Sequence, residues 1–235
     1  MVERSSCDRT SAVKSRKTAV AFNPLPTPVL AAGISRSLSI TLVDDDLIMK
    51  KRIVVGISGA SGVIYGIRLL SVLRDTAYET HLILTEAAKQ NIGLETTYAL
   101  KTVEALADIV HANENQAAAP ASGSFLTAGM IVIPCTVKTL SGIVHSYNDN
   151  LLTRSADVTL KEQRKLVLVV RETPLHLGHL KLMLAAAELG AVILPPVPAF
   201  YHQPETIQDI VDQTVGKTLD CFGIDHNLFR RWGES

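Results

Sequence analysis

From Arg52 onward, short runs rich in β-branched and other apolar residues alternate with longer segments that have a helical period. The runs at 53–57, 81–84, 130–133, 166–170 and 191–194 have the length of strands. Alternation of this kind is typical of βαβ units. We therefore expect an α/β fold, a single doubly wound domain of the Rossmann-like or flavodoxin-like type with a mostly parallel sheet. Helices are predicted by apolar residues spaced three or four apart, at Ile64, Ile67, Leu70 and Leu73 and again at Leu177, Leu180 and Leu184.

Length and composition fit one globular domain and exclude several classes of protein. The chain has 235 residues, of which 47% are hydrophobic and 20% are charged, enough apolar material for a buried core. Because 23 Lys and Arg balance 23 Asp and Glu, no overall field draws the protein to nucleic acid or to a membrane surface. No apolar run approaches the roughly 20 residues that span a bilayer.

Cysteine usage indicates a reducing compartment. Cys7, Cys135 and Cys221 are the three cysteines, an odd number without a C-x-x-C pair. That pattern argues against a disulfide framework and against a structural zinc site. We expect a cytoplasmic protein that needs no metal.

The first 48 residues differ in composition from the rest. They are rich in basic residues, Ser and Thr, which resembles a transit peptide, but they show no clean amphipathic period and end near Asp44-Asp45-Asp46. Such a segment cannot build a core alone. We expect a disordered or spurious extension at 1–48 and the folded domain at 49–235, with Met49 as an alternative start.

A glycine-rich turn follows the first predicted strand. Gly56, Gly59 and Gly62 are spaced G-x-x-G-x-x-G, and an amphipathic segment begins at Val63. Small residues let backbone amides approach an anion, and the N-terminus of the following helix attracts negative charge. The turn predicts a ligand that carries phosphate, although this motif alone is weak.

The same turn occurs in nicotinamide dehydrogenases, and Glu86 lies about where a ribose-binding acid would be. Against that class, the tyrosines at 65, 98, 147 and 201 all lack the Lys four residues later that a short-chain dehydrogenase uses. An acid at the start of a helix is also common for dipole reasons alone. We favour the helix-end interpretation of Glu86.

A second strand-to-helix turn covers 134–142, with hydroxyl groups at Thr136, Thr139 and Ser141. Two such turns on neighbouring strands can hold one nucleotide. Cys135 is a possible nucleophile here, but it follows Pro134 and lacks His and Asp partners nearby in sequence. A small buried thiol is the better interpretation.

Cations recur later in the chain. Arg154 and Lys161 are about two helical turns apart and can share a helix face, and Arg171-Glu172 ends a buried strand at the edge where such sheets bind ligands. Together with Lys217 and the hydroxyl of Tyr201, these cations suit a phosphate monoester. A solvated helix face is the alternative for Arg154 and Lys161. His176 and His179 have a metal-ligand spacing, but without a third ligand we favour packing at a helix start.

Residues 51–235 resemble the UbiX-type flavin prenyltransferases over their whole length. Several separated motifs carry the resemblance, in the same order: GISGASGVIYG at 56–66, LET at 94–96, ASGS at 121–124, PCTVKTLSG at 134–142, RSADVTLKE at 154–162, RETP at 171–174 and PAFYHQP at 198–204.

The resemblance implies transfer of the dimethylallyl group of dimethylallyl phosphate to N5 and then C6 of reduced FMN, which makes prenylated FMN for UbiD-type decarboxylases. It also implies a homo-oligomer, expected to be a dodecamer. The FMN contacts it implies are Gly59, Ala60, Ser61, Thr85, Thr136, Val137, Lys138, Thr139 and Arg171. The allyl phosphate contacts it implies are Arg154, Lys161, Glu172, Tyr201 and Lys217, and the catalytic residues are Ser61, Glu95 and Glu172.

Two positions depart from the family pattern. Thr85 stands where Ser is common, which keeps the hydroxyl, and Lys217 stands where Arg is common, which replaces a planar fork by a point charge. Three other functions stay open at this stage: a flavin-dependent cysteine decarboxylase of the same fold, a non-catalytic FMN carrier, and a nicotinamide oxidoreductase. The cations at 154, 161 and 217 favour the prenyltransferase over the decarboxylase.

Overall fold

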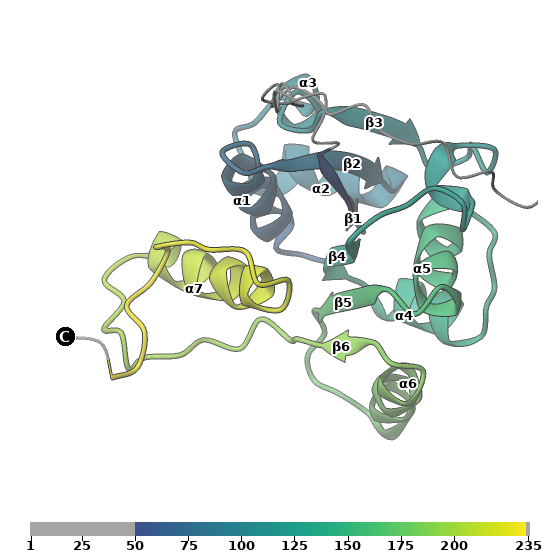
Figure 1. Cartoon of the computed structure of the whole chain (residues 1–235). Coiled ribbons are helices and arrows are strands. Elements are labelled where there is room, and N and C mark those ends of the chain that lie inside the picture. The colour runs from purple at the N-terminus through teal and green to yellow at the C-terminus, as the bar shows by residue number, and fades with distance from the viewer. Residues whose placement is uncertain (1–49, 234–235) are drawn as a thin grey trace, which may run out of the picture. The chain divides into compact units, whose positions relative to one another are not determined.

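The computed structural model describes residues 50–233, and the predictions for 1–48 lie outside them. Six parallel strands form one sheet in the order β3-β2-β1-β4-β5-β6 (Figure 1). This order confirms the doubly wound α/β fold predicted from the sequence. The strands are β1 (Lys51–Ile57), β2 (Tyr78–Leu84), β3 (Ile109–Ala112), β4 (Gly129–Cys135), β5 (Lys165–Val170) and β6 (Val192–Ile193).

Helices cover both faces of the sheet, which explains why its central strands are apolar throughout. The helices are α1 (Val63–Leu73), α2 (Glu86–Glu95), α3 (Leu100–Glu104), α4 (Val137–Val144), α5 (Leu151–Lys161), α6 (Leu177–Glu188) and α7 (Ile207–Asp220), with a 3-10 turn, η2 (Ala119–Ala121). One face carries α1, α2, α3 and α7, and the other carries α4, α5 and α6 (Figure 1).

The alternation of β1 shows how the sequence builds two cores. Ile53, Val55 and Ile57 are fully buried against the α1 and α7 side. Val54 points to the α4 and α5 side, because successive side chains of a strand alternate between faces. Gly56 follows on that second side, where a Cβ would lie 3.1 Å from Leu152 Cδ1. The backbone of β1 therefore lies close to α5.

Strand β3 was not predicted from the sequence. It lies at the edge of the sheet, pairs with β2 alone, and leaves Ile109 and Val110 about 40% exposed. An edge strand of four residues needs no continuous apolar run, so it leaves little pattern to read.

Helix α6 forms where it was predicted, but its apolar stripe does not join the core. Leu177, Leu180 and Leu184 are 66%, 50% and 60% exposed, whereas Ala186 is buried. The spacing predicts the helix and its apolar face without saying what covers that face. Among the helices at 50–233, none is long and apolar enough to cross a membrane.

Candidate active site

A cleft opens where the chain changes direction across the sheet. From β1 the chain winds outward through β2 to β3, and from β4 it winds the other way through β5 to β6. Ligands bind at such a switch point, at the carboxyl ends of the strands. The cleft there has a volume of about 920 Å³ and is lined by Ser58, Gly59, Thr85, Glu86, Ala87, Asn113, Glu114, Thr136, Lys138, Thr139, Ser141, Gly142, His145, Tyr147, Asp149, Asn150 and Thr153.

Ser58 joins the two predicted phosphate turns. Its Oγ donates to the carbonyl of Pro134 at 2.9 Å and accepts from the amide of Thr136 at 2.8 Å. The side chain is 1% exposed, so these bonds are shielded from water. Sequence reasoning missed this residue, although a hydroxyl between the apolar end of β1 and Gly59 was a signal.

The backbone of Gly59 lies close to helix α2. A Cβ on Gly59 would clash with the Cβ of Ala87, and Asn91 Nδ2 donates to the Gly59 carbonyl at 3.0 Å. Glycine is required because no larger residue fits between the turn and α2. The turn is therefore held rigidly at the edge of the cleft.

Glu95 lies at the start of α1. Its Oε2 accepts from the amide of Gly62 at 2.7 Å and from that of Val63 at 3.3 Å. The carboxylate of Glu95 satisfies the first amides of α1 and interacts favourably with the helix dipole. These are the groups that were expected to bind a phosphate. Ser61, beside them, is exposed. Glu95 therefore occupies the end of the glycine-rich turn that is nearest α1. The start of the same turn, Ser58 and Gly59, lines the cleft.

The turn after β4 is organised by Thr136. Its Oγ1 caps α4 by accepting from the amide of Thr139 at 3.0 Å and lies 2.9 Å from the hydroxyl of Thr139. Lys138 is exposed at the rim of the cleft, and Val137 lies on the other side of α4. Cys135 is fully buried, and burial raises the pKa of its thiol far above the usual range, which confirms the buried-thiol interpretation.

The ends of β2 and β3 complete the cleft. Thr85 caps α2 by accepting from the amide of Ala88 at 3.2 Å. Glu86 is in the first turn of α2 and pairs with Lys89 at 2.6 Å, as expected for a helix-end acid. Asn113, which sequence reasoning missed, accepts the amides of Leu151 and Leu152 and so fixes the start of α5. Its position just after β3 was hidden because β3 itself was not predicted.

Two consecutive charged residues, Arg171 and Glu172, follow β5 beside the second turn. The amide of Arg171 donates to the carbonyl of Cys135 at 3.0 Å, so β5 and β4 stay paired to this point. Glu172 is exposed and accepts from the amide of Thr173 at 3.0 Å. Ala60, in the first turn, is buried.

The cations of α5 lie beside the end of η2 and the residues just after it. Arg154 donates to the carbonyl of Ala121 at 3.2 Å and pairs with Asp157 at 3.2 Å. Lys161 pairs with Glu162 next to Gly123. Both side chains therefore reach the same stretch of chain, residues 121–123.

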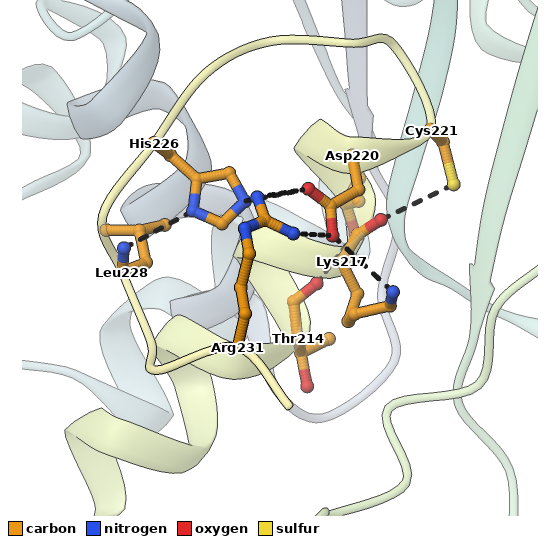
Figure 2. Close-up of polar contacts among 8 residues, drawn as sticks. Thr214, Lys217, Asp220, Cys221, His226, Leu228 and Arg231 are labelled. Atoms are coloured by element: carbon orange, nitrogen blue, oxygen red, sulfur yellow. Dashed lines mark hydrogen bonds and ion pairs between the residues drawn. The ribbon is translucent and has the colours of Figure 1, made fainter. Parts of the chain in front are cut away.

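Lys217 and Tyr201 lie elsewhere. Lys217 is on α7, where it contacts Asp220 (Figure 2), and the ring of Tyr201 packs edge-on against Trp232. Since α7 and α5 cover opposite faces of the sheet, one copy of the described chain does not bring the predicted cations into one pocket.

No group of three His, Cys, Asp or Glu residues within 50–233 is arranged to hold a metal ion. His176 caps α6 by accepting from the amide of Gly178, and its ring lies 3.6 Å from that of His179. The helix-start interpretation of these histidines is confirmed.

The cleft has the size and chemistry for a flavin mononucleotide. Pockets for such ligands have volumes of about 300 to 1,000 Å³. Backbone at Gly59 and the hydroxyls of Thr85, Thr136, Thr139 and Ser141 offer polar contacts at helix starts, and Lys138 offers a positive charge. The fold and site define a nucleotide-binding protein of the doubly wound class.

Comparisons with known proteins agree. Residues 44–219 match the family model described as Flavoprotein. The curated flavin prenyltransferase UbiX of Salmonella typhimurium is 62% identical over 185 residues, which cover 77% of this chain and 98% of that protein. The chain belongs to the flavoprotein family and, within it, to the UbiX-type flavin prenyltransferases.

Solved structures show the same relationship. The crystal structure of AnUbiX in complex with FMN and dimethylallyl pyrophosphate is 49% identical with a TM-score of 0.78, and the match covers 80% of this chain and 100% of that one. A dodecameric FMN-dependent UbiX-like decarboxylase from Escherichia coli O157:H7 is 52% identical with a TM-score of 0.76, over 77% of this chain and 98% of that one.

Proposed function

We propose that the chain joins the dimethylallyl group of dimethylallyl phosphate to N5 and then to C6 of reduced FMN. The observation that carries this proposal is the pair of turns after β1 and β4, which Ser58 joins by two hydrogen bonds at the edge of the cleft. The chain that carries these turns belongs to the flavin prenyltransferase family. The prenylated flavin then serves a UbiD-type decarboxylase. The absence of any disulfide-forming pattern supports a cytoplasmic location.

FMN binds along the cleft. Reduced FMN supplies the nucleophilic N5 and C6 atoms. The contacts are those named from the resemblance, and the structure supports most of them by placing Gly59, Thr85, Thr136, Lys138 and Thr139 on the cleft wall. Ala60, Ser61 and Val137 are adjacent to these residues in the same turns, and Arg171, just after β5, is tied to the second turn through the carbonyl of Cys135. Because Ser58 and Asn91 fix the turns in advance, little ordering is required on binding.

The leaving phosphate is held by Arg154, Lys161 and Lys217 with the hydroxyl of Tyr201. Preorganised cations stabilise the charge that develops on the oxygen when the allylic C–O bond breaks. Since α5 and α7 cover opposite faces of the sheet, this set is completed between copies of the chain in a homo-oligomer, a dodecamer as in the Escherichia coli relative.

Three residues have proposed roles near the reacting atoms. Glu172, exposed at the end of β5, contacts the allyl phosphate and accepts a proton when the second bond forms. Ser61 and Glu95 lie together at the start of α1, where Glu95 fixes the turn that presents Ser61. Exclusion of water from this region protects the allylic cation.

Mass spectrometry of the released flavin tests the proposal. Anaerobic incubation of the full chain with reduced FMN and dimethylallyl phosphate is expected to add one five-carbon unit to the flavin, and Glu172→Gln is expected to abolish formation of the ring-closed product. Unchanged FMN from the wild-type protein would support a non-catalytic carrier. Oxidative release of carbon dioxide from a cysteinyl substrate would support the decarboxylase instead.

A further inference from the structure

A cluster of charged side chains is centred on Asp220, at the end of α7 (Figure 2). Arg231 donates to both carboxylate oxygens, at 2.7 and 3.1 Å. His226 Nε2 lies 3.2 Å from Oδ1, and Lys217 Nζ lies 3.4 Å from Oδ2. One carboxylate therefore connects a helix residue, Lys217, to two residues of the C-terminal segment.

Hydrogen bonds hold the ring of His226 on both sides. Its Nδ1 accepts from the amide of Leu228 at 3.3 Å, and its Nε2 lies 3.2 Å from Asp220 Oδ1 and 3.4 Å from Arg231 Nη2. The side chain is 2% exposed. Close packing fixes it further, since a Cβ on Gly216 would lie only 2.6 Å from His226 Cε1. The segment after α7 is thus held against the helix beside Lys217.

Asp220 is ionised beside two cations. Hydrogen bonds from Arg231 hold the pKa of Asp220 below its usual range, so the carboxylate stays charged. Lys217 and Arg231 both contact it. The Lys217 side chain is still 50% exposed. The carboxylate that Lys217 shares with Arg231 can therefore orient the ammonium group while leaving it accessible to an incoming phosphate.

We propose that Asp220 is a positioning residue for Lys217, which it holds toward the phosphate of the allyl substrate; this inference rests on the proposed function of Lys217. A lysine is a point charge on a flexible stem, so ordering it on binding loses conformational entropy that a planar, forked arginine loses less of. The contact with Asp220, three residues later on α7, restricts that stem before the substrate arrives. Asp220 thereby compensates for Lys at a position where Arg is common.

The test is Asp220→Asn in the full-length oligomer. The KM for dimethylallyl phosphate, and its Kd measured by calorimetry with oxidised FMN bound, are expected to rise about three- to tenfold. The kcat and the Kd for FMN are expected to stay within about twofold, because the flavin cleft is elsewhere. Asp220→Glu, which restores the charge, is expected to recover most of the affinity.

Asp212→Asn is the matched control. Asp212 is also on α7 and forms an equivalent pair, with Arg68 of α1 at 2.7 Å, but does not contact Lys217. It is expected to lower the thermal stability while leaving the KM for dimethylallyl phosphate within about twofold. A double-mutant cycle with Lys217→Ala separates the positioning effect from any other. In that background, which has little turnover, Asp220→Asn is expected to leave the Kd for dimethylallyl phosphate, measured by calorimetry, unchanged.

The results distinguish this inference from the proposed function. A wild-type protein that neither binds dimethylallyl phosphate nor modifies FMN would contradict the proposed function itself. A functional wild-type protein with an unchanged or lowered KM in Asp220→Asn, or with an undiminished effect of Asp220→Asn in the Lys217→Ala background, would overturn the positioning role alone. Should Asp220→Asn fail to assemble, Asp220→Ser provides the same comparison.

Discussion

At the scale of single residues, burial decides which reactive groups are available for chemistry. Cys135 follows the apolar core of β4, is 0% exposed, and has a thiol whose pKa burial raises. Because the thiolate is the reactive form, this cysteine is inert in the folded protein. We predict that iodoacetamide at neutral pH leaves Cys135 unmodified until a denaturant is added, as peptide mass spectrometry would measure. Rapid labelling in the native protein would contradict this assignment.

A second residue-scale prediction concerns two histidines in contact. His81 Nε2 lies 2.8 Å from Glu79 Oε1, and its Nδ1 lies 2.9 Å from His111 Nε2. Burial and the nearby His81 lower the pKa of His111. Protons on both of the facing nitrogens would bring two N–H groups against each other.

The sign of the pH effect follows from that lowered pKa. A group whose pKa is lower in the folded state contributes stability above its unfolded value, about 6.5 for His, and that stability is lost as the pH falls through the folded value. We predict that the free energy of unfolding falls between pH 7 and pH 5, as urea titrations would measure. His111→Asn is expected to flatten this dependence, whereas His145→Asn, at an exposed site, is expected to leave it unchanged.

At the scale of elements, helix α1 depends on a residue from α2. Gly62 has φ 98° and offers no side chain as a cap, so Glu95 satisfies the first amides instead. We predict that Glu95→Ala destabilises the protein by about 1 kcal/mol, the usual effect of losing a cap. Chemical denaturation measures this, with Glu86→Gln, a residue of an exposed pair, as the control.

Glu95→Gln separates the cap from the catalytic role. Glutamine keeps an acceptor for the Gly62 amide but loses the charge. Stability is expected to be mostly retained, while prenyl transfer falls if the carboxylate acts in the reaction. Full activity in Glu95→Gln would leave Glu95 with its structural role only.

Elements with a strong apolar period were predictable, and those without one were not. The four buried strands, β1, β2, β4 and β5, and the turns around Gly59 and Thr136 follow from local residue patterns, because burial on both faces requires continuous apolar runs. Strand β6 lies at one edge of the sheet and was predicted from the apolar run at 191–194. Strand β3, at the other edge, and with it Asn113 escaped notice because β3 is half exposed and His111 interrupts its apolar residues. Ser58 was missed for another reason: its two hydrogen bonds join segments 76 and 78 residues apart, and no local pattern reports such contacts.

At the scale of the whole molecule, one copy of the described chain leaves the proposed cations apart and part of its apolar surface uncovered. Apolar side chains of α6 are exposed, and the cations of α5 and α7 lie on opposite faces of the sheet. Both observations have the same explanation if other copies cover α6 and bring a second set of cations to each cleft. The sequence contained all of these residues, but spacing along one chain does not show that they meet between chains.

Mixed oligomers test this arrangement. We predict that Arg154→Ala and Lys217→Ala are each nearly inactive, and that co-assembling them restores activity, because about a quarter of randomly formed sites receive α5 and α7 from copies with the needed residue intact. Co-assembly of Arg154→Ala with Lys161→Ala is the control. Both residues lie on α5, so every site keeps one defect and no activity should return. Turnover assays of the two mixtures decide the matter: activity in the first mixture no higher than the mean of its parents would mean that each site draws all its cations from one copy.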